Sequence, residues 1–204
     1  MVTKIMQIKE KSSCILCGST QNKVSFPYSI KFSESEFFYK RCSSCKCVFI
    51  NPIPSDDDFE KIYQNENYHE EHYVDVDLSE YEASVGLLSK YISNDDAKVL
   101  DYGCGYGHFL KALQNNKFQA EGLEFDESAS IKAEHYSGCK VYPVNKLINI
   151  EKNSFNVLHL GDVLEHLPNP LQTLKKLIGI LDTNGIIFIE GPLETNPSPV
   201  YWAA

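Results

Sequence analysis

From residue 97 onward, short apolar runs alternate with longer stretches in which apolar positions recur every three or four residues. The short runs predict strands, and the longer stretches predict helices. Strands that alternate with helices of about 10–15 residues are typical of a parallel sheet with right-handed crossovers, so we expect an α/β fold. The predicted strands are KVLDYG (98–103), FQAEGLEFD (118–126), KVYPV (140–144), FNVLHLGD (155–162) and GIIFIEGP (185–192), and the predicted helices are GHFLKALQNN (107–116), ESASIKAEHYSG (127–138) and NPLQTLKKLIGILDTNG (169–185).

Before residue 97 the pattern changes twice. Residues 12–50 show little helical periodicity and predict short strands and turns, a segment too small to form much core without a staple. Residues 55–96 predict helices instead, and the clearest is an amphipathic helix that also packs on the following domain. Its apolar positions are Tyr81, Val85, Leu88 and Ile92.

The spacing of the cysteines indicates what stabilises this segment. Cys14 and Cys17 form one C-x2-C pair, and Cys42 and Cys45 form a second. Four thiolates complete the tetrahedron that zinc prefers, and a closed set of this kind predicts a structural zinc rather than a catalytic one. Cys47 is an alternative ligand to Cys45, although the x2 spacing favours Cys45, and free buried cysteines are the other interpretation.

The charge distribution divides the chain at about the same places. The formal net charge of −9 is the sum of +5 over residues 1–50, −11 over residues 51–96 and −3 over residues 97–204. We therefore expect a zinc-binding ribbon over 1–52, a helical connector or lid over 53–96 and a third domain over 97–204. The acidic balance argues against nucleic acid as a partner, and the basic ribbon is the one segment that keeps this alternative open.

A glycine-rich turn, residues 101–107, directly follows the first predicted strand of the third domain. Glycines allow a sharp turn and the close approach of a ligand. Glu124 ends the next strand, where a carboxylate accepts the ribose hydroxyls of an adenosine, and Phe125 beside it is placed to lie against adenine. Asp101 at the mouth of the turn would repel a pyrophosphate. A cationic adenosine compound such as S-adenosylmethionine therefore suits the turn better than a dinucleotide.

Three motifs carry a resemblance to a known family. VLDYGCGYGHFL resembles motif I of class I S-adenosylmethionine-dependent methyltransferases, LEFD resembles their acidic ribose motif, and GDVLEHLPNP resembles the D-x-x-E-H-L-x-x-P segment of many members. With its cysteine pairs, the chain is similar to members with an N-terminal zinc-binding domain, including sugar C-methyltransferases. The resemblance covers residues 12–195 and implies a Rossmann-like parallel sheet, with S-adenosylmethionine bound by residues 97–204.

The resemblance also implies a set of site residues. Glu165 and His166 would face the substrate cleft, with His166 as a general base. The alternative is that His166 caps or packs locally and that Glu165 is a solvated helix residue. Cys104 lies where the turn needs a small side chain, so we interpret it as packing rather than as a nucleophile. The expected cofactor-binding residues are Asp101, Gly103, Cys104, Gly105, Gly107, Glu124, Phe125, Gly161 and Asp162.

The family sheet usually has seven strands, and this sequence stops after the fifth predicted strand. That strand would form a bare edge, so we expect a truncated natural protein, a fragment, or a second copy or partner chain that covers the edge. The sequence has no apolar run long enough to span a membrane and no apolar segment at its start, which predicts a cytoplasmic protein without membrane contact.

The leading functional hypothesis is methyl transfer from S-adenosylmethionine to a small polar acceptor, with a nucleotide-linked sugar as the finer suggestion by analogy. The first alternative is a non-catalytic module that binds S-adenosylmethionine or a partner through a truncated methyltransferase fold. The second alternative is a nicotinamide-dependent oxidoreductase. Asp101 and the D-x-x-E-H-L segment argue against it.

Overall fold

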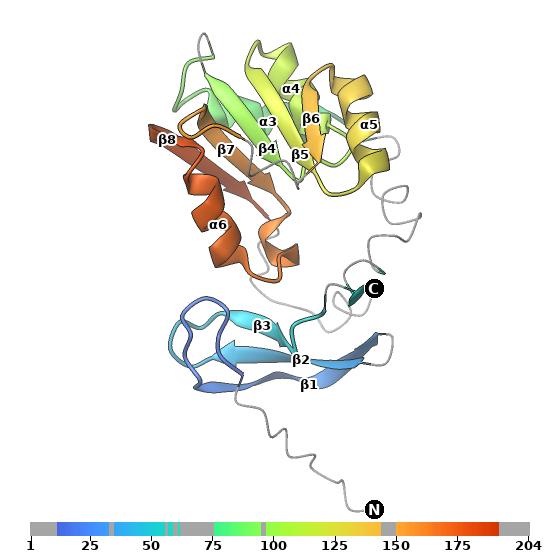
Figure 1. The fold of residues 1–204 in the computed structure, drawn as a ribbon, viewed down its shortest axis with the longest axis vertical. Helices are drawn as coiled ribbons and strands as arrows, with labels where there is room; N and C mark the ends of the chain where they lie inside the picture. Colours follow the sequence, from blue (N-terminus) through green and yellow to red (C-terminus); the bar gives the residue numbers. More distant parts are fainter. Residues whose placement is uncertain are drawn as a thin grey trace, which may run out of the picture. The chain divides into compact units, whose positions relative to one another are not determined.

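The computed structural model describes residues 12–32, 35–55, 57–58, 61, 76–94, 97–143 and 150–191. These residues form two compact units, which are treated separately (Figure 1).

The first unit contains an antiparallel sheet of three strands in the order β1-β2-β3. Its strands are β1 (Asn22–Phe32), β2 (Ser35–Cys42) and β3 (Val48–Asn51). The buried cluster beside them consists of Cys14, Cys42 and Phe49, with Ile15 and Cys47 packed against it. Two of the three buried side chains in this cluster are cysteines, and Phe37 of β2 is a further buried apolar side chain, so apolar burial alone gives this unit a small core, as the sequence predicted.

The second unit is built on a parallel sheet of five strands in the order β6-β5-β4-β7-β8, which confirms the predicted α/β fold (Figure 1). The chain passes from β4 outward to β5 and β6, then returns to the other side of β4 for β7 and β8. The strands are β4 (Lys98–Tyr102), β5 (Gln119–Glu124), β6 (Lys140–Pro143), β7 (Phe155–Gly161) and β8 (Leu181–Glu190), and the helices are α3 (Ser79–Leu88), α4 (His108–Asn115), α5 (Glu127–Ser137) and α6 (Pro170–Ile178).

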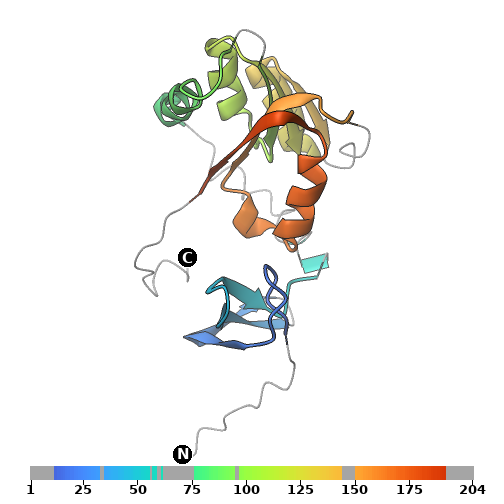
Figure 2. The same ribbon diagram turned by 90° about the vertical axis from the view of Figure 1, so that its left-hand side faces the viewer.

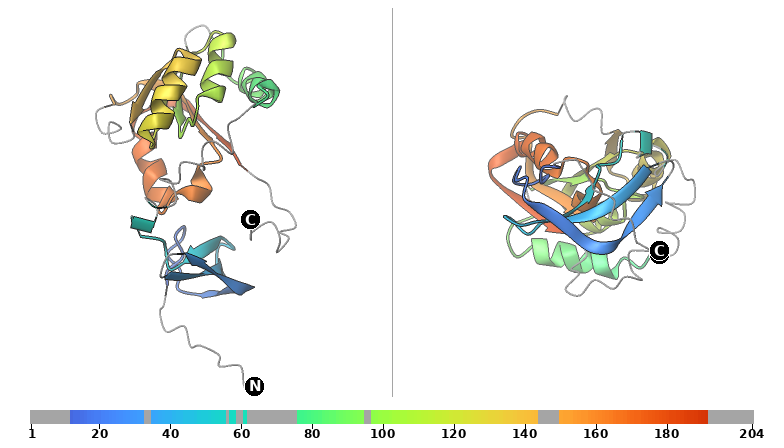
Figure 3. Two further views of the ribbon diagram at one scale, coloured as in Figure 1. Left: turned by 90° about the vertical axis from the view of Figure 1, so that its right-hand side faces the viewer. Right: turned by 90° about the horizontal axis from the view of Figure 1, so that it is seen from below.

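Helices cover both faces of this sheet. Val85 and Leu88 of α3 pack with residues of α4 on one face, as the helical spacing around residues 81–92 predicted. Leu177 of α6 packs on the opposite face (Figure 2). Helices α4 and α5 lie side by side (Figure 3, left), where Leu110 and Ala133 share a small buried cluster. Because successive strand residues face opposite sides, Val99 and Asp101 face α3 and α4, whereas Leu100 faces α6.

The predicted boundary between the last helix and the last strand was wrong. Helix α6 ends at Ile178, and β8 begins at Leu181 rather than Gly185. The apolar residues 180 and 181 continue the strand pattern, and the pairing of β7 with β8 contains an irregularity after Phe155. Gly185 therefore lies inside a bent strand, where an added Cβ would collide with the side chain of Leu181, and does not end a helix.

Several predictions fall wholly or partly outside the described residues. Most of the predicted helical segment 55–74 lies there, so the connector or lid over 53–96 and the boundaries at 52/53 and 96/97 stay predictions. Strand β8 is the outer strand of the sheet as far as the structure describes it, and Ile189 on it is 49% exposed. A cover for this edge also stays a prediction. No helix among the described residues is both long and apolar enough to cross a membrane.

Two glycines give a matched test of this packing. Gly107 has φ +85°, and an added Cβ would lie 2.9 Å from the carbonyl oxygen of Ala133 in α5, whereas a Cβ on Gly86 in α3 would meet nothing within 4 Å. We expect Gly107→Ala to lower the free energy of unfolding by roughly 1–3 kcal/mol. Gly86→Ala should leave it unchanged or raise it by up to about 1 kcal/mol. Urea unfolding without ligand measures both, and equal effects would contradict this packing.

Candidate functional site

Adjacent strands bring two acidic side chains to the same edge of the parallel sheet. Asp101 of β4 is paired in register with Gly122 of β5, and Glu124 ends β5 two residues later. Asp101 is 3% exposed and Glu124 is 5% exposed. Ligands of open α/β sheets bind outside the carboxyl ends of the strands, so both carboxylates occupy the edge where a ligand site is expected.

Four backbone amides of the glycine-rich turn, those of residues 103, 104, 105 and 107, are engaged within the protein. Those of Gly103 and Cys104 donate to a carbonyl oxygen of β5 at 2.7 and 3.1 Å, and that of Gly107 donates to the carbonyl oxygen of Cys104 at 2.9 Å. The amide of Gly105 donates to Oε2 of Glu124 at 2.8 Å. A pyrophosphate site instead presents free amides to the anion. The turn is therefore unlike a dinucleotide site.

Three backbone amides fix the orientation of Glu124. Besides Gly105, the amides of Phe125 and Asp126 donate to its Oε1 at 2.6 and 3.0 Å. The Phe125 ring beside it is 53% exposed and packs edge-on against Tyr102, with ring centroids 5.6 Å apart. The site thus offers a held carboxylate next to an exposed aromatic ring.

Cys104 shapes the turn. Its side chain is buried and lies against Gly122 of β5, where an added Cβ would be 2.7 Å from Sγ. Burial raises the pKa of the Cys104 thiol far above its usual range. A neutral, enclosed thiol of this kind packs rather than attacks.

The sequence analysis missed the residue that binds Asp101. His159 of β7 pairs in register with Asp101, and its Nδ1 lies 2.7 Å from Oδ1 of Asp101. Its Nε2 lies 3.1 Å from Oε2 of Glu190, the last residue of β8. Ser84 of α3 donates to Oε1 of Glu190 at 2.6 Å. Three neighbouring strands therefore place a carboxylate, an imidazole and a second carboxylate in one row, in which Asp101 and His159 are buried and Glu190 is partly exposed.

The charges of this row favour a protonated imidazole. Burial lowers the pKa of His159, but the Asp101 and Glu190 carboxylates outweigh burial and raise it to about 9. The hydrogen bond from His159 in turn lowers the pKa of Glu190. At neutral pH the row is therefore an imidazolium shared by two carboxylates.

Packing encloses the His159 ring. The Phe109 ring of α4 lies over it, with centroids 3.8 Å apart and an angle of 30° between the planes. Gly161, expected at the cofactor site, leaves room for the ring, since an added Cβ would lie 2.9 Å from Cε1 of His159. Gly161 therefore borders the His159 ring as well as the edge of the sheet, and a side chain at this position would collide with the ring.

One oxygen of Asp101 is left without a donor. Among the residues that the structure describes, Oδ2 of Asp101 has no hydrogen-bond partner, although it is buried. A buried carboxylate oxygen without a donor is costly, and a ligand that supplies an N–H group would remove that cost.

The loop after β7 positions the remaining expected residues. Asp162 is exposed, has φ +50° and donates its amide to the carbonyl oxygen of Glu190 at 3.1 Å. Glu165 and His166 follow on a short 3₁₀-helix, η2 (Leu164–His166), and are also exposed. An added Cβ on Gly103 would lie 2.7 Å from the side chain of Val163, so the glycine-rich turn and this loop meet at the same edge. The catalytic roles of Glu165 and His166 stay predictions.

His159 and Glu190 each left a weak signal in the sequence. His159 is a polar residue inside the buried apolar run FNVLHLG, and Glu190 directly follows the apolar run IIFI. Such an interruption predicts a partner, because a buried polar group is usually hydrogen-bonded. The identity of the partner depends on strand register across three strands, which local pattern does not give.

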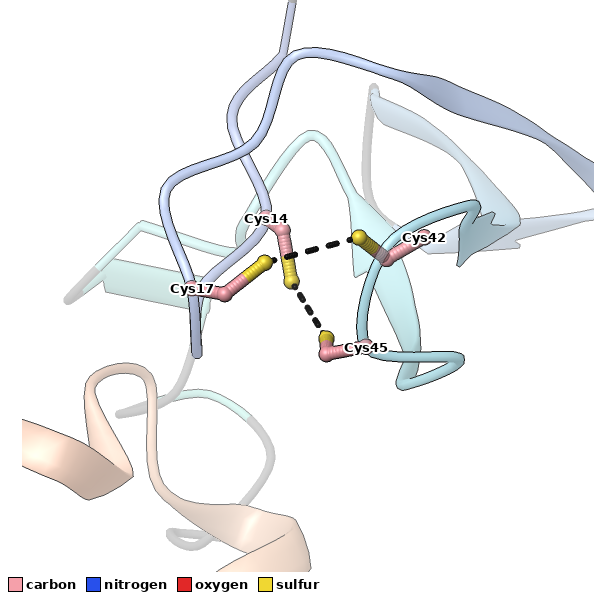
Figure 4. A group of neighbouring side chains, drawn as sticks. All are labelled: Cys14, Cys17, Cys42 and Cys45. Atoms are coloured by element: carbon pink, nitrogen blue, oxygen red, sulfur yellow. Dashed lines mark hydrogen bonds between the residues drawn. The ribbon is translucent and has the colours of Figure 1, made fainter.

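The four predicted cysteines converge in the first unit (Figure 4). Cys14 and Cys17 lie in the loop before β1, Cys42 ends β2, and Cys45 lies in the turn after it. All four sulfur atoms lie within 4.8 Å of one another, with 3.5 Å between Cys14 and Cys45 and 3.6 Å between Cys17 and Cys42. A tetrahedral zinc site with Zn–S bonds of ~2.3 Å requires about 3.8 Å between sulfurs, so the cluster fits that ion.

Backbone amides and neighbouring thiols set the ionisation of this cluster. The amides of Cys45 and Ser44 lower the pKa of the Cys42 thiol to about 6. The amide of Cys47 acts to lower the pKa of Cys45, but desolvation and the other three thiols together raise it to about 12. A divalent cation would stabilise all four as thiolates. Cys47 is not part of the cluster and donates to the carbonyl oxygen of Val48 at 3.4 Å.

Because His159 is protonated in the folded protein, we expect the free energy of unfolding to depend on pH. The pKa of His159 is raised from 6.5 to about 9 in the folded protein, so its stabilising contribution is complete below pH 6.5 and is lost as the pH rises through 9. We expect the difference in unfolding free energy between wild type and His159→Gln to shrink over this interval. Urea unfolding at several pH values measures it, and a difference that stays constant with pH would show that His159 is neutral when folded.

Comparison with known proteins agrees with this architecture. A family model described as a methyltransferase domain matches residues 71–203. The ubiquinone biosynthesis O-methyltransferase of Bordetella avium is 27% identical over 113 residues, which cover 52% of this chain and 46% of that protein. Its namesake from Nitrosospira multiformis is 24% identical over 126 residues, which cover 58% of this chain and 52% of that protein. The chain thus spans about half the length of the curated relatives it matches.

A solved structure shows the same fold. The crystal structure of a SAM dependent methyltransferase from Archaeoglobus fulgidus matches with a TM-score of 0.51 at 22% identity, covering 59% of this chain and 55% of that chain. The family match extends over more than half of the chain and includes the glycine-rich turn, Glu124 and the loop after β7. The protein therefore belongs to the methyltransferase domain family.

Proposed function

We propose that this protein binds S-adenosylmethionine at the carboxyl edge of its parallel sheet and transfers the methyl group to a small polar acceptor. The observation that carries the proposal is the buried Oδ2 of Asp101, which has no donor among the described residues and lies one strand from the amide-fixed carboxylate of Glu124. An ammonium group is the donor that a buried carboxylate favours, and S-adenosylmethionine combines one with an adenosine.

The roles of the binding residues follow from their positions. Asp101 would accept a hydrogen bond from the ammonium group, and Glu124 would accept from the ribose hydroxyls. The exposed ring of Phe125 would lie against the adenine. Gly161 and Asp162 would border the methionine end of the ligand from the loop after β7. The turn that the ligand approaches contains Gly103, Cys104, Gly105 and Gly107.

Positioning would supply most of the catalysis. When bound, S-adenosylmethionine offers a methyl group on a sulfonium, which a nucleophile attacks in line while the C–S bond breaks and leaves a neutral thioether. The protein holds the two reactants in line and excludes water. Where the nucleophile is a hydroxyl, His166 or Glu165 would accept its proton, because both are exposed on the loop beside the site.

The chemical class of the methyl acceptor is a more specific proposal. The relatives described above are named O-methyltransferases of ubiquinone biosynthesis, which favours a hydroxyl acceptor for this protein. A nucleotide-linked sugar, accepting the methyl group on oxygen or on carbon, is the acceptor suggested by the cysteine-rich N-terminal segment. A methyl-release assay on pools of phenols and of nucleotide-linked sugars distinguishes these two classes.

We also propose that Cys14, Cys17, Cys42 and Cys45 bind one structural Zn²⁺. The converging sulfur atoms support this, and so does the small apolar core of the first unit. With four thiolate ligands the ion has no open position, so it would stabilise the fold and would not activate a substrate.

The cofactor proposal predicts selective binding. We expect wild-type protein to bind S-adenosylmethionine and not NADH in isothermal titration. Asp101→Asn keeps the shape but removes the charge, and it should weaken binding by about tenfold or more, because a hydrogen bond between charged groups contributes roughly 1.5–3 kcal/mol. Asp182→Asn, at an exposed position of β8, is the matched control and should bind like wild type. Binding of NADH without S-adenosylmethionine would refute the proposal.

The metal proposal predicts a stoichiometry. Elemental analysis should find about one zinc per wild-type chain. Cys17→Ser should lose that zinc and unfold at a lower temperature, because three thiolates leave the tetrahedron open. Cys47→Ser lies outside the cluster and should keep both the zinc and the unfolding temperature. Zinc loss in Cys47→Ser but not in Cys17→Ser would reassign the ligand set.

A further inference from the structure

We propose that His159 is a positioning residue of the cofactor site, holding the Asp101 carboxylate by one oxygen so that Oδ2 stays available to the cation of the ligand. The inference rests on the proposed function and extends it to a residue that touches neither the ligand nor the reacting atoms. The juxtaposition that carries it is the row Asp101, His159 and Glu190 across β4, β7 and β8.

Strand register fixes the first contact. Asp101 and His159 are directly paired residues of neighbouring parallel strands, so the backbone ladder sets the distance between their side chains. The resulting bond of 2.7 Å between Nδ1 and Oδ1 uses one oxygen of Asp101. The other oxygen, Oδ2, is the buried one without a donor among the described residues.

The second contact determines the charge of His159. A carboxylate only accepts hydrogen bonds, so an imidazole between two carboxylates donates from both ring nitrogens, and this requires the protonated form. Nε2 lies 3.1 Å from Oε2 of Glu190, and Ser84 of α3 holds the other oxygen of Glu190 at 2.6 Å. The raised pKa of His159, about 9, agrees with this geometry.

Packing prevents the ring from turning away. The Phe109 ring lies over the imidazole, with ring centroids 3.8 Å apart. Gly161 has no Cβ, and a Cβ there would lie 2.9 Å from Cε1 of His159, so the ring fits closely against this glycine. His159 itself is 4% exposed. The ring is therefore held by two hydrogen bonds and by the aromatic stack.

Charge balance explains why the ligand would need His159. Two carboxylates and one imidazolium leave a single negative charge in the row, where Asp101 is buried and Glu190 is partly exposed, and an ammonium group of the ligand would neutralise it. Without the imidazolium, two carboxylates would repel each other there, and one is expected to take up a proton. A protonated acid no longer attracts a cation as strongly, so affinity for the ammonium would fall.

Other titratable groups lie near the row, among them two with raised pKa values, two exposed carboxylates and one buried carboxylate. Burial, with the charges of Asp101 and other carboxylates, raises the pKa of Tyr81 on α3. Burial likewise raises the pKa of Cys104 in the glycine-rich turn. Glu80 of α3 and Asp162 after β7 are exposed, and their charges also act on Tyr81. Glu124 of β5 is a further buried carboxylate, and its charge acts together with that of Asp101 on Cys104.

The test compares a cationic with a neutral ligand. His159→Gln should weaken the affinity for S-adenosylmethionine by about tenfold or more. It should change the affinity for 5′-methylthioadenosine, which lacks the ammonium and the sulfonium, by less than about twofold. The affinity of the variant for S-adenosylmethionine should also decrease from pH 7.0 to about 5.5, where the ligand's own α-amino group stays charged. The wild-type ratio of the two affinities should stay flat across this range.

Each outcome decides between separate claims. An equal loss of affinity for both ligands in His159→Gln, or a pH profile of affinity like that of wild type, would show that His159 is only structural. Either result would overturn the positioning role and leave the proposed function standing. Wild-type protein that binds 5′-methylthioadenosine and S-adenosylmethionine equally well would also overturn it. Wild-type protein that binds neither ligand refutes the proposed function, and the positioning role with it.

Glu190→Gln provides a second test should His159→Gln fail to fold. This variant keeps the bond from His159 to Asp101 and removes one of the two charges that hold the proton on the imidazole. Ring NMR of His159 should show titration at a lower pH than in wild type. The affinity for S-adenosylmethionine should change over that same pH interval, with 5′-methylthioadenosine unaffected. Affinity that does not follow the titration of His159 would overturn the proposal.

Discussion

A buried imidazolium between two carboxylates connects the parallel sheet of this protein to its candidate site. Asp101, His159 and Glu190 come from three neighbouring strands and meet because those strands pair in register. Asp101 and His159 are buried, where an unbalanced carboxylate is costly. The register of the sheet therefore sets both the ionisation of the row and which oxygen of Asp101 is left without a donor among the described residues.

The glycine-rich turn adds a second, independent constraint. Four of its amides donate to carbonyl oxygens of the protein or to Glu124, which leaves those four unavailable to a phosphate and holds Glu124 in one orientation. Two carboxylates at this edge, with those amides already used, favour a cationic adenosine ligand over a dinucleotide. The first unit has only a small apolar core, and the proposed zinc on its four cysteines would add to its stability.

Local pattern predicted much of this arrangement. The parallel strands and the position of Glu124 at the end of β5 follow from periodicity. The start of β8 was missed because Gly185 resembles a helix end, whereas it lies in a bent strand. His159 and Glu190 were missed because their role exists only through register. Two C-x2-C pairs indicated four ligands, and folding brought those four together without Cys47.

A cationic adenosyl ligand should complete the hydrogen bonding of Asp101, and a crystal structure of the protein with S-adenosylmethionine tests this. We expect a nitrogen of the ligand at about 2.7–3.2 Å from Oδ2 of Asp101, with the ribose hydroxyls on Glu124 and the His159 bond to Asp101 intact. A bound ligand whose ammonium lies away from Asp101, or a ribose that does not contact Glu124, would contradict it.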